Sequence, residues 1–324
     1  MLARTLLAVG ASKPERVARG RLLILTFHRV LPDELRKEYP LPGLAVTPEE
    51  LHWILSELLP HFELMTVSDA VRRLRHDRAP RPLIAVSFDD GQWDNLEYAA
   101  PVLKALDVRA TFYVPTDYVG KTQLLWHDRA AFAWQMSAPD VRASVIARSS
   151  TLSLNPEASV AAFLEAVKRI DPQTRATIVE RLSERVQAGP SWARLMTWQE
   201  VMSLRQAGHE IGSHSCSHAL LPQLDDAAQR AELLGSMNAI KEALGEQPKS
   251  LCYPNGSFDS RSVAIAKELG YENAVTTRWG LNDRQHAVYE LLRCDMDAKR
   301  VKDRHGNLSL ARLTMRIAGY QPGL

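Results

Sequence analysis

The sequence predicts an α/β protein built as a parallel (β/α) barrel, and three observations support this fold class. Apolar runs typical of buried strands alternate about eight times with amphipathic stretches typical of helices, over 324 residues. Capping signals mark where several helices begin and end. The residues suited to chemistry follow the carboxyl ends of different strands, where a barrel places its active site.

The predicted strands are mostly continuous apolar runs, as expected for strands that are covered on both faces. They are expected at residues 21–28, 62–67, 83–88, 109–114, 209–213, 250–253, 273–277 and 290–296. Because predicted helices separate most of these runs, neighbouring strands are expected to be parallel.

Several predicted helices begin at recognisable capping residues. Thr47 to Glu50 combines a threonine N-cap, a proline in the first turn and a glutamate three residues on, and Thr197 to Glu200 is a second capping box. Other helices are expected to begin at Ser68, near Asp94 and Asp226, and at Asp259, with ends near Leu74, Leu106, Gly208, Gly245 and Gly270.

One interval, residues 126–194, interrupts the alternation. It is helical in pattern, with Asp171 and Pro172 as a helix start, and it contains no convincing strand. We interpret it as a helical insertion on the barrel rim. The expected organisation is therefore an N-terminal helix or tail at residues 1–20, followed by a single barrel unit at 21–324.

Composition argues against several classes of protein. The net charge is +2 and no polybasic run stands out, so nucleic acid is not an expected partner. No apolar run approaches the ~18 residues of a membrane span. Cys216, Cys252 and Cys294 are few and widely spaced, which predicts reduced thiols. Residues 1–10 make a weak signal peptide, so we expect a cytoplasmic protein, with membrane-peripheral binding and export left open.

Two short motifs carry the residues suited to catalysis. Asp89, Asp90 and Gly91 directly follow a predicted strand. Neighbouring strand residues point to opposite faces, but at the strand end Gly91 lets both carboxylates turn toward one cavity. His214 and His218 also follow a strand. On a helical turn, this spacing places two imidazoles on one face, close enough to share a cation.

Two histidines and one carboxylate form a metal-ligand set that leaves positions open for water and substrate. An isolated H-x-x-x-H pair is more often a pair of surface or core histidines, but the carboxylates at a second strand end change that balance. We therefore predict that Asp90, His214 and His218 bind Zn²⁺ or another divalent ion such as Co²⁺ or Ni²⁺. Such an ion lowers the pKa of bound water toward ~7, and Asp89 would act as the general base.

These residues resemble a known family. The stretch SFDDG at 87–91 is similar to the first motif of the polysaccharide deacetylases with a NodB-type domain (carbohydrate esterase family 4), and HSCSH at 214–218 is similar to their second. The resemblance covers roughly residues 20–120 and 195–296. It implies a distorted (β/α) barrel and metal-dependent removal of acetyl groups, usually from N-acetylglucosamine units. In that family the first aspartate is the base and the second binds metal.

The third motif of the family departs here from its usual form, R-x-P-Y-G, because residues 252–256 read CYPNG. Cys252 stands where the family has the arginine that orients the base. We hypothesise that Arg293 supplies the missing cation from another strand, with an ordinary surface arginine as the alternative. Asn255 holds the position whose backbone N–H helps to bind the oxyanion in the family, and Tyr253 beside it is a further substrate candidate.

The late L-x-H motif that supplies the family's general acid is absent from the C-terminal part. Residues 26–30, TFHRV, resemble the [YF]-H-x-V stretch of bacterial biofilm-type deacetylases acting on poly-N-acetylglucosamine. In those proteins a permuted order places the acid histidine at the first strand. The resemblance assigns His28 as the acid that protonates the leaving amine, with a buried structural histidine as the alternative.

Trp93, Trp126 and Trp279 lie near predicted strand ends or rim loops, where an indole ring can stack on a sugar. Most tryptophans are packing residues, so none of the three is more than a candidate. Of the three, Trp93 is the one that we include in the predicted substrate site.

The predicted function is a metal-dependent deacetylase of an N-acetylated glycan, such as the N-acetylglucosamine units of an exopolysaccharide or its precursor. Two alternatives stay open. A carbohydrate-binding protein on a decayed barrel would explain Cys252 and the missing late histidine motif. An amidohydrolase for a small non-sugar amide would use the same chemistry. The sequence does not predict an oligomeric state.

Overall fold

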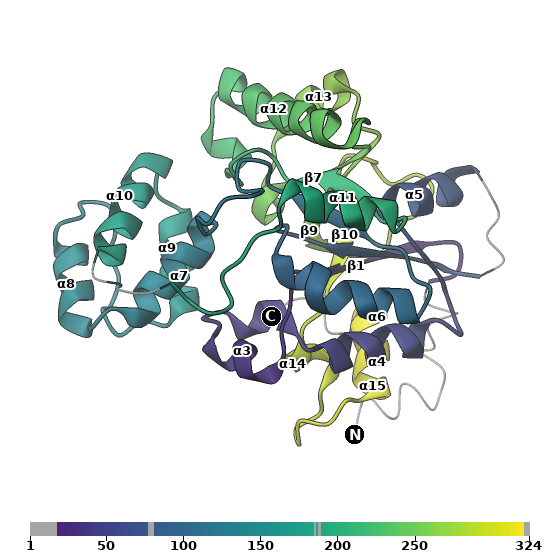
Figure 1. Ribbon diagram of the computed structural model, residues 1–324, viewed down its shortest axis with the longest axis horizontal. Coiled ribbons are helices and arrows are strands. Elements are labelled where there is room, and N and C mark those ends of the chain that lie inside the picture. The colour runs from purple at the N-terminus through teal and green to yellow at the C-terminus, as the bar shows by residue number, and fades with distance from the viewer. Residues whose placement is uncertain (1–17, 77–80, 185, 187–188, 321–324) are drawn as a thin grey trace.

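The computed structural model describes residues 18–76, 81–184, 186 and 189–320, and its centre is a closed barrel of parallel strands (Figure 1). The predicted residues 1–17 of an N-terminal helix or tail lie outside the described part. In spatial order the barrel strands are β1 (Leu22–Phe27), β10 (Leu291–Asp295), β9 (Asn273–Trp279), β8 (Ser250–Cys252), β7 (Glu210–Ser213), β6 (Thr111–Val114) and β5 (Leu83–Phe88). The ring closes because β5 pairs with β1, which confirms the predicted (β/α) barrel.

The barrel is distorted at β5. On one edge, β5 pairs with β1 along its whole length. On the other edge its first half pairs with the short strand β4 (Glu63–Met65), and only Ser87 and Phe88 pair with β6. The short strand β4 is therefore an eighth strand that pairs with β5 at one end of the barrel only, and it does not extend along the whole length of β5.

The alternation of side chains along the strands explains which residues reach the interior. In β5, Ile84, Val86 and Phe88 pack in one apolar cluster with the surrounding helices. Leu83 and Ala85 belong to a second cluster that gathers residues from several strands and from the helix after β4. Successive strand residues face opposite sides, so Ser87 and Asp89 continue the side of Leu83 and Ala85.

Helices surround the barrel, as the sequence predicts. They are α3 (Asp33–Glu38), α4 (Pro48–Leu58), α5 (Val67–His76), α6 (Ala100–Ala105), α11 (Trp198–Gln206), α12 (Asp226–Leu244), α13 (Ser260–Leu269), α14 (Ala298–Val301) and α15 (Leu310–Ile317). A small pair of strands, β2 (Arg29–Val30) and β3 (Ala45–Val46), lies beside the end of β1, and short 3₁₀ turns cover Pro42–Leu44, Leu221–Gln223 and Pro254–Gly256. Both predicted capping boxes, at Thr47 and Thr197, are present. Within the described residues, no helix has the length and apolar character needed to cross a membrane.

Two helix starts differ from the prediction. Helix α5 begins at Val67, so Ser68 lies inside its first turn and does not cap it. The Ser68 hydroxyl and N–H instead donate to the half-buried carboxylate of Glu210. The helix expected from about Asp94 begins with a π-helical turn, Asn95–Ala99, and becomes α-helical only at Ala100.

The predicted insertion forms a helical lobe at one side of the barrel, at the left of Figure 1. It contains α7 (Trp126–Met136), α8 (Pro139–Ala147), α9 (Val160–Lys168) and α10 (Pro172–Ser183). These helices share an apolar cluster of their own, in which Trp134 stacks on Phe163 with ring centroids 4.2 Å apart. The first turn of α7 opens the insertion and contributes Trp126 and His127 to the site described next.

Candidate active site

A cavity of about 500 Å³ opens at the carboxyl ends of the strands. Its walls bring together residues from both motifs and from the insertion. The polar residues among them are Thr26, His28, Asp89, Asp90, His127, Lys168, His214, His218, Asn255, Thr277, Arg293, Asp295 and Arg300. The cavity is also the place where segments far apart in the sequence converge, as expected for the active-site end of a barrel.

The end of β5 turns both carboxylates into this cavity. Asp89 follows the inward side of the strand, and its backbone N–H still pairs with Phe27 of β1 at 3.0 Å. Asp90 and Gly91 have positive φ values of 76° and 63°. This left-handed turn is unusual for an aspartate and brings the Asp90 side chain back toward the cavity. Both carboxylates are buried.

Asp90, His214 and His218 form a compact cluster of possible metal ligands. Asp90 Oδ1 lies 3.4 Å from His214 Nε2 and 3.3 Å from His218 Nε2. One ligand atom from each of the three residues lies within 4.8 Å of the other two. Two imidazole nitrogens and one carboxylate oxygen are donors that suit Zn²⁺ and similar divalent ions, so the residues present fit such an ion.

The two histidines do not share a helical face, which corrects the prediction. Residues 214–220 form a loop, and Ser215 and His218 have positive φ values of 60° and 56°. The carboxylate of Glu232 in α12 holds this loop by accepting the N–H groups of Cys216 and Ser217, each at 2.9 Å. The two histidines therefore come together because Glu232 holds the loop between them in a tight turn.

Hydrogen bonding and burial prepare the histidines as ligands. His214 Nδ1 lies 2.8 Å from the carbonyl oxygen of Cys252, so Nδ1 carries a proton and the ring is turned with Nε2 facing Asp90. Burial lowers the pKa of His218 to about 4, which keeps that ring neutral. Burial also opposes a charge on His214, but Cys252 and Asp90 outweigh it and raise the pKa of His214 well above its usual value. The environment of Asp90, His214 and His218 thus favours a positive charge at this place, as a bound cation would supply.

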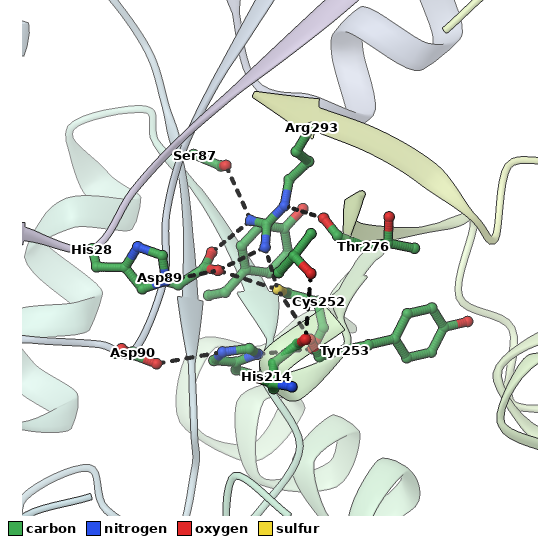
Figure 2. Close-up of polar contacts among 12 residues, drawn as sticks. His28, Ser87, Asp89, Asp90, His214, Cys252, Tyr253, Thr276 and Arg293 are labelled. Atoms are coloured by element: carbon green, nitrogen blue, oxygen red, sulfur yellow. Dashed lines mark hydrogen bonds and ion pairs between the residues drawn. The ribbon is translucent and has the colours of Figure 1, made fainter. Parts of the chain in front are cut away.

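Asp89 forms a two-point ion pair with Arg293 of β10 (Figure 2). Arg293 Nη1 and Nη2 lie 2.8 Å from Oδ1 and Oδ2, and Nε donates to the carbonyl oxygen of Thr276 at 2.6 Å. Burial favours a neutral Asp89, but Arg293 outweighs it and lowers the pKa of Asp89 to about 2. The Cys252 thiol lies beside this pair, 3.3 Å from Arg293 and 3.5 Å from Asp89. The contact predicted from the altered third motif is present.

His28 and Asn255 line the same cavity. His28 Nε2 lies 3.9 Å from Asp89 Oδ2, and its side chain is 21% exposed, so it faces both the base and the open space. Asn95 fixes the backbone there by donating to the His28 carbonyl oxygen at 2.8 Å. Asn255 has a φ of 57° and lies in the 3₁₀ turn after β8.

Two substrate candidates, Tyr253 and Trp93, do not line the cavity, so the structure does not bring them together with the other predicted residues. The Tyr253 side chain points away from the cluster (Figure 2) and stacks on Phe258 at 4.9 Å, because alternation after Cys252 turns it outward. Trp93 packs against the outer core, with Arg194 over its ring at 4.7 Å. Trp279 also belongs to that outer cluster, whereas Trp126 does line the cavity.

The prediction missed His127. It comes from the first turn of α7 and lies 3.6 Å from Asp90, measured from Nε2 to Oδ2. Burial opposes its charge, but Asp128 and Asp90 together raise the pKa of His127 above its usual value. No motif marks this position, and the only available signal was that a histidine and an aspartate open the insertion beside Trp126.

The fold and the site together define a parallel (β/α) barrel with a cluster of possible metal ligands and a paired carboxylate in one cavity. The sequence pattern of the polysaccharide deacetylase family matches residues 76–274, which is more than half of the chain. The chain therefore belongs to the polysaccharide deacetylase family, as its motifs predicted, and its members hydrolyse acetyl groups from polysaccharides.

Individual relatives are distant. A putative polysaccharide deacetylase of Bacillus subtilis, YxkH, is 20% identical over 72% of this chain and 58% of its own length. Chitin deacetylase 1 of Cryptococcus neoformans is 32% identical over 27% of this chain and 19% of its own length. The chain thus spans less than two thirds of these relatives.

Two solved structures share the fold over most of the chain. IcaB from Ammonifex degensii has a TM-score of 0.60 and 16% identity, covering 93% of this chain and 96% of that one. The Streptococcus pyogenes deacetylase PplD, in complex with acetate, has a TM-score of 0.58 and 18% identity, covering 86% and 94%. At this identity the likeness shows the shared barrel and no more.

Proposed function

We propose that the protein is a metal-dependent deacetylase that removes N-acetyl groups from a glycan, with N-acetylglucosamine units of an exopolysaccharide or its precursor as the substrate. The observation that carries this proposal is the placement of two groups in one cavity. A carboxylate held ionised by Arg293 stands beside the cluster of Asp90, His214 and His218. We further propose that residues 21–324 act as one catalytic unit, with the insertion at 126–194 forming its rim.

Asp90, His214 and His218 would hold the ion, with Zn²⁺ as the first candidate and Co²⁺ or Ni²⁺ as alternatives. When bound, such an ion polarises the amide carbonyl and makes a bound water more acidic. The orientation of His214, with Nε2 facing Asp90, and the neutral ring of His218 support this ligand set.

Asp89 is proposed as the general base. It would accept a proton from the attacking water, while Arg293 holds the carboxylate ionised and oriented. The water oxygen bonds to the acetyl carbon, and the backbone N–H of Asn255 would stabilise the negative charge on the former carbonyl oxygen. His28, across from Asp89, would donate a proton to the amide nitrogen as the C–N bond breaks. The products are acetate and a free amine.

Two observations support a glycan as the substrate. Trp126 presents an aromatic side chain to the cavity, and tryptophan faces suit the apolar side of a sugar ring. The chitin deacetylases among the relatives act, by their names, on an acetylated polysaccharide. The bidentate Arg293–Asp89 pair argues against a decayed barrel, because it restores the cation that Cys252 cannot supply.

Acetate release from N-acetylglucosamine oligomers by zinc-loaded protein tests the proposal. We expect turnover that is lost on chelation, is restored by added Zn²⁺, and falls at least ~100-fold in Asp89→Asn. Asp140→Asn, an exposed position in α8, is the matched control and should keep full activity. Stoichiometric metal without release from any oligomer would contradict the glycan substrate and favour a small amide. Absence of both metal and activity would favour a carbohydrate-binding protein.

A further inference from the structure

We infer that His127, contributed by the helical insertion, is a positioning residue of the metal centre that fixes the orientation of the Asp90 carboxylate. The inference rests on the proposed function, because it concerns how the proposed ligand set is held. The insertion would then have a role at the active-site end of the barrel, because the first turn of α7 would help to hold the metal site in place.

The two oxygens of Asp90 face different partners. Oδ1 lies 3.4 Å and 3.3 Å from the Nε2 atoms of His214 and His218, on the side where an ion would bind. Oδ2 lies 3.6 Å from Nε2 of His127. A carboxylate with only one oxygen held can rotate about its terminal bond. A donor facing the other oxygen limits that rotation, as groups around metal ligands commonly do.

His127 Nε2 also lies 3.7 Å from Oδ1 of its neighbour Asp128, whose own position is fixed by several contacts. Asp128 is buried and accepts hydrogen bonds from Tyr39 at 2.9 Å and Gln92 at 3.1 Å, with Arg29 at 3.5 Å. Gln92 lies two residues after Asp90, and Arg29 follows His28. The same turn of α7 is therefore tied to the loop of the metal ligand and to the strand end of the proposed acid.

Arg29 makes this connection stiff. Its guanidinium lies 2.8 Å from Asp94 and packs against the rings of Tyr39 and Trp192, each at 5.0 Å. A buried charge with this many partners has little freedom to move, because any displacement leaves it unpaired. The insertion is thus anchored to the barrel directly behind the site.

His127 fits a positioning role better than a ligand role. Among the described residues, two sets of possible metal-ligand atoms lie within 4.8 Å of one another: those of Asp90, His214 and His218, and those of Asp89, His214 and Cys252. His127 belongs to neither set. Its ring lies 4.9 Å from the ring of His218 and 5.8 Å from that of Trp126, so packing alone is the competing explanation. The two explanations differ in what they require of the side chain: an N–H donor, or an aromatic ring.

Two substitutions separate these explanations. H127F keeps a ring of similar size and removes the donor, whereas H127Q removes the ring and keeps an N–H donor at a similar reach. Co²⁺ affinity is measured for each by competition with a chromophoric chelator, together with the visible absorption of the bound Co²⁺, which reports coordination geometry. Thermal unfolding without metal checks that each variant is folded. His52→Ala, at an exposed position in α4, is the control.

We expect H127F to weaken Co²⁺ binding about 10- to 100-fold and to change the absorption bands, with H127Q closer to the wild type. His52→Ala should match the wild type in both measurements. Unchanged affinity and bands in H127F, equal losses in both variants, or a greater loss in H127Q would overturn the inference while leaving the proposed function intact. A wild-type protein that binds no ion would overturn both.

Discussion

Arg293 and Asp89 are separated by 204 positions in the chain, yet both guanidinium nitrogens lie 2.8 Å from the two carboxylate oxygens. Both side chains are buried. The cation comes from β10 because Cys252, at the end of β8, leaves room for it beside the thiol at 3.3 Å. The guanidinium that pairs with Asp89 thus comes from β10, and not from the end of β8, where the third motif of the family has its arginine.

Replacing Arg293 with alanine is expected to lower kcat/KM for acetate release at least ~100-fold, because Asp89 loses the charge that keeps it ionised and oriented. It should also lower the free energy of unfolding by about 3–5 kcal/mol, since a buried carboxylate is left unpaired. Acetate release and urea unfolding measure the two effects. Arg148→Ala, an exposed position, is the control, and near-normal turnover in Arg293→Ala would contradict the assigned role.

A second substitution makes this test sharper. Adding Cys252→Arg to Arg293→Ala places a guanidinium next to Asp89 from β8, as in the usual third motif of the family. We expect about a tenfold or greater recovery of kcat/KM over Arg293→Ala alone. In the presence of Arg293, Cys252→Arg should instead be harmful, because two cations and a larger side chain compete for one buried space. No recovery in the double variant would mean that the position of Arg293 on β10 is itself required.

Glu232→Gln tests the clamp on the histidine loop. The carboxylate of Glu232 accepts two backbone N–H groups at 2.9 Å and so stabilises a turn that contains positive φ angles. The neutral amide is a weaker acceptor, so metal affinity should fall about tenfold and metal-free stability by about 1–3 kcal/mol. Isothermal titration and thermal unfolding measure these changes. Glu242→Gln, exposed on the same helix, should change neither.

His209 should make stability depend on pH. Its Nδ1 accepts the N–H of Ala110 at 3.2 Å, and burial lowers the pKa of His209 to about 4, with Arg109 contributing to the same shift. Between an unfolded pKa of 6.5 and that value, the unfolded chain binds more protons. The stabilisation is therefore complete above pH ~6.5 and is lost as the pH falls toward ~4, by at most ~1.4 kcal/mol per unit.

Urea unfolding at about pH 7 and about pH 5 measures this dependence. His209→Gln does not titrate and should show a smaller fall in the free energy of unfolding between the two values. His305→Gln, at an exposed position, should behave as the wild type. An equal fall in His209→Gln and the wild type would assign the acid sensitivity to other groups.

Much of the barrel could be predicted because its signals are local. The strand at 83–88 is predicted with its observed bounds, since six consecutive buried residues make a continuous apolar run. The capping boxes at Thr47 and Thr197 likewise depend on four adjacent residues. Asp89 and Asp90 could be placed at a strand end for the same reason, and the missing arginine of the third motif directed attention to Arg293.

The remaining features depend on contacts that leave no local signal. The loop of His214 and His218 takes its shape from Glu232, which lies in a later helix, so spacing alone suggested a helix that does not form. The outward direction of Tyr253 follows from the register of β8, which sequence reasoning did not apply beyond the motif. His127 meets Asp90 only after the insertion folds back onto the barrel.

Strand β10 is late in the sequence and has two roles. It pairs with β1 in the wall of the barrel, and it carries Arg293, the ion-pair partner of the proposed base Asp89. During synthesis, Asp89 leaves the ribosome long before Arg293, and until β10 docks its carboxylate has no guanidinium partner. In a partly folded chain without β10 in place, the barrel would therefore be open and the Asp89 carboxylate would lack its guanidinium partner. Formation of the Asp89–Arg293 pair is in this way coupled to completion of the fold.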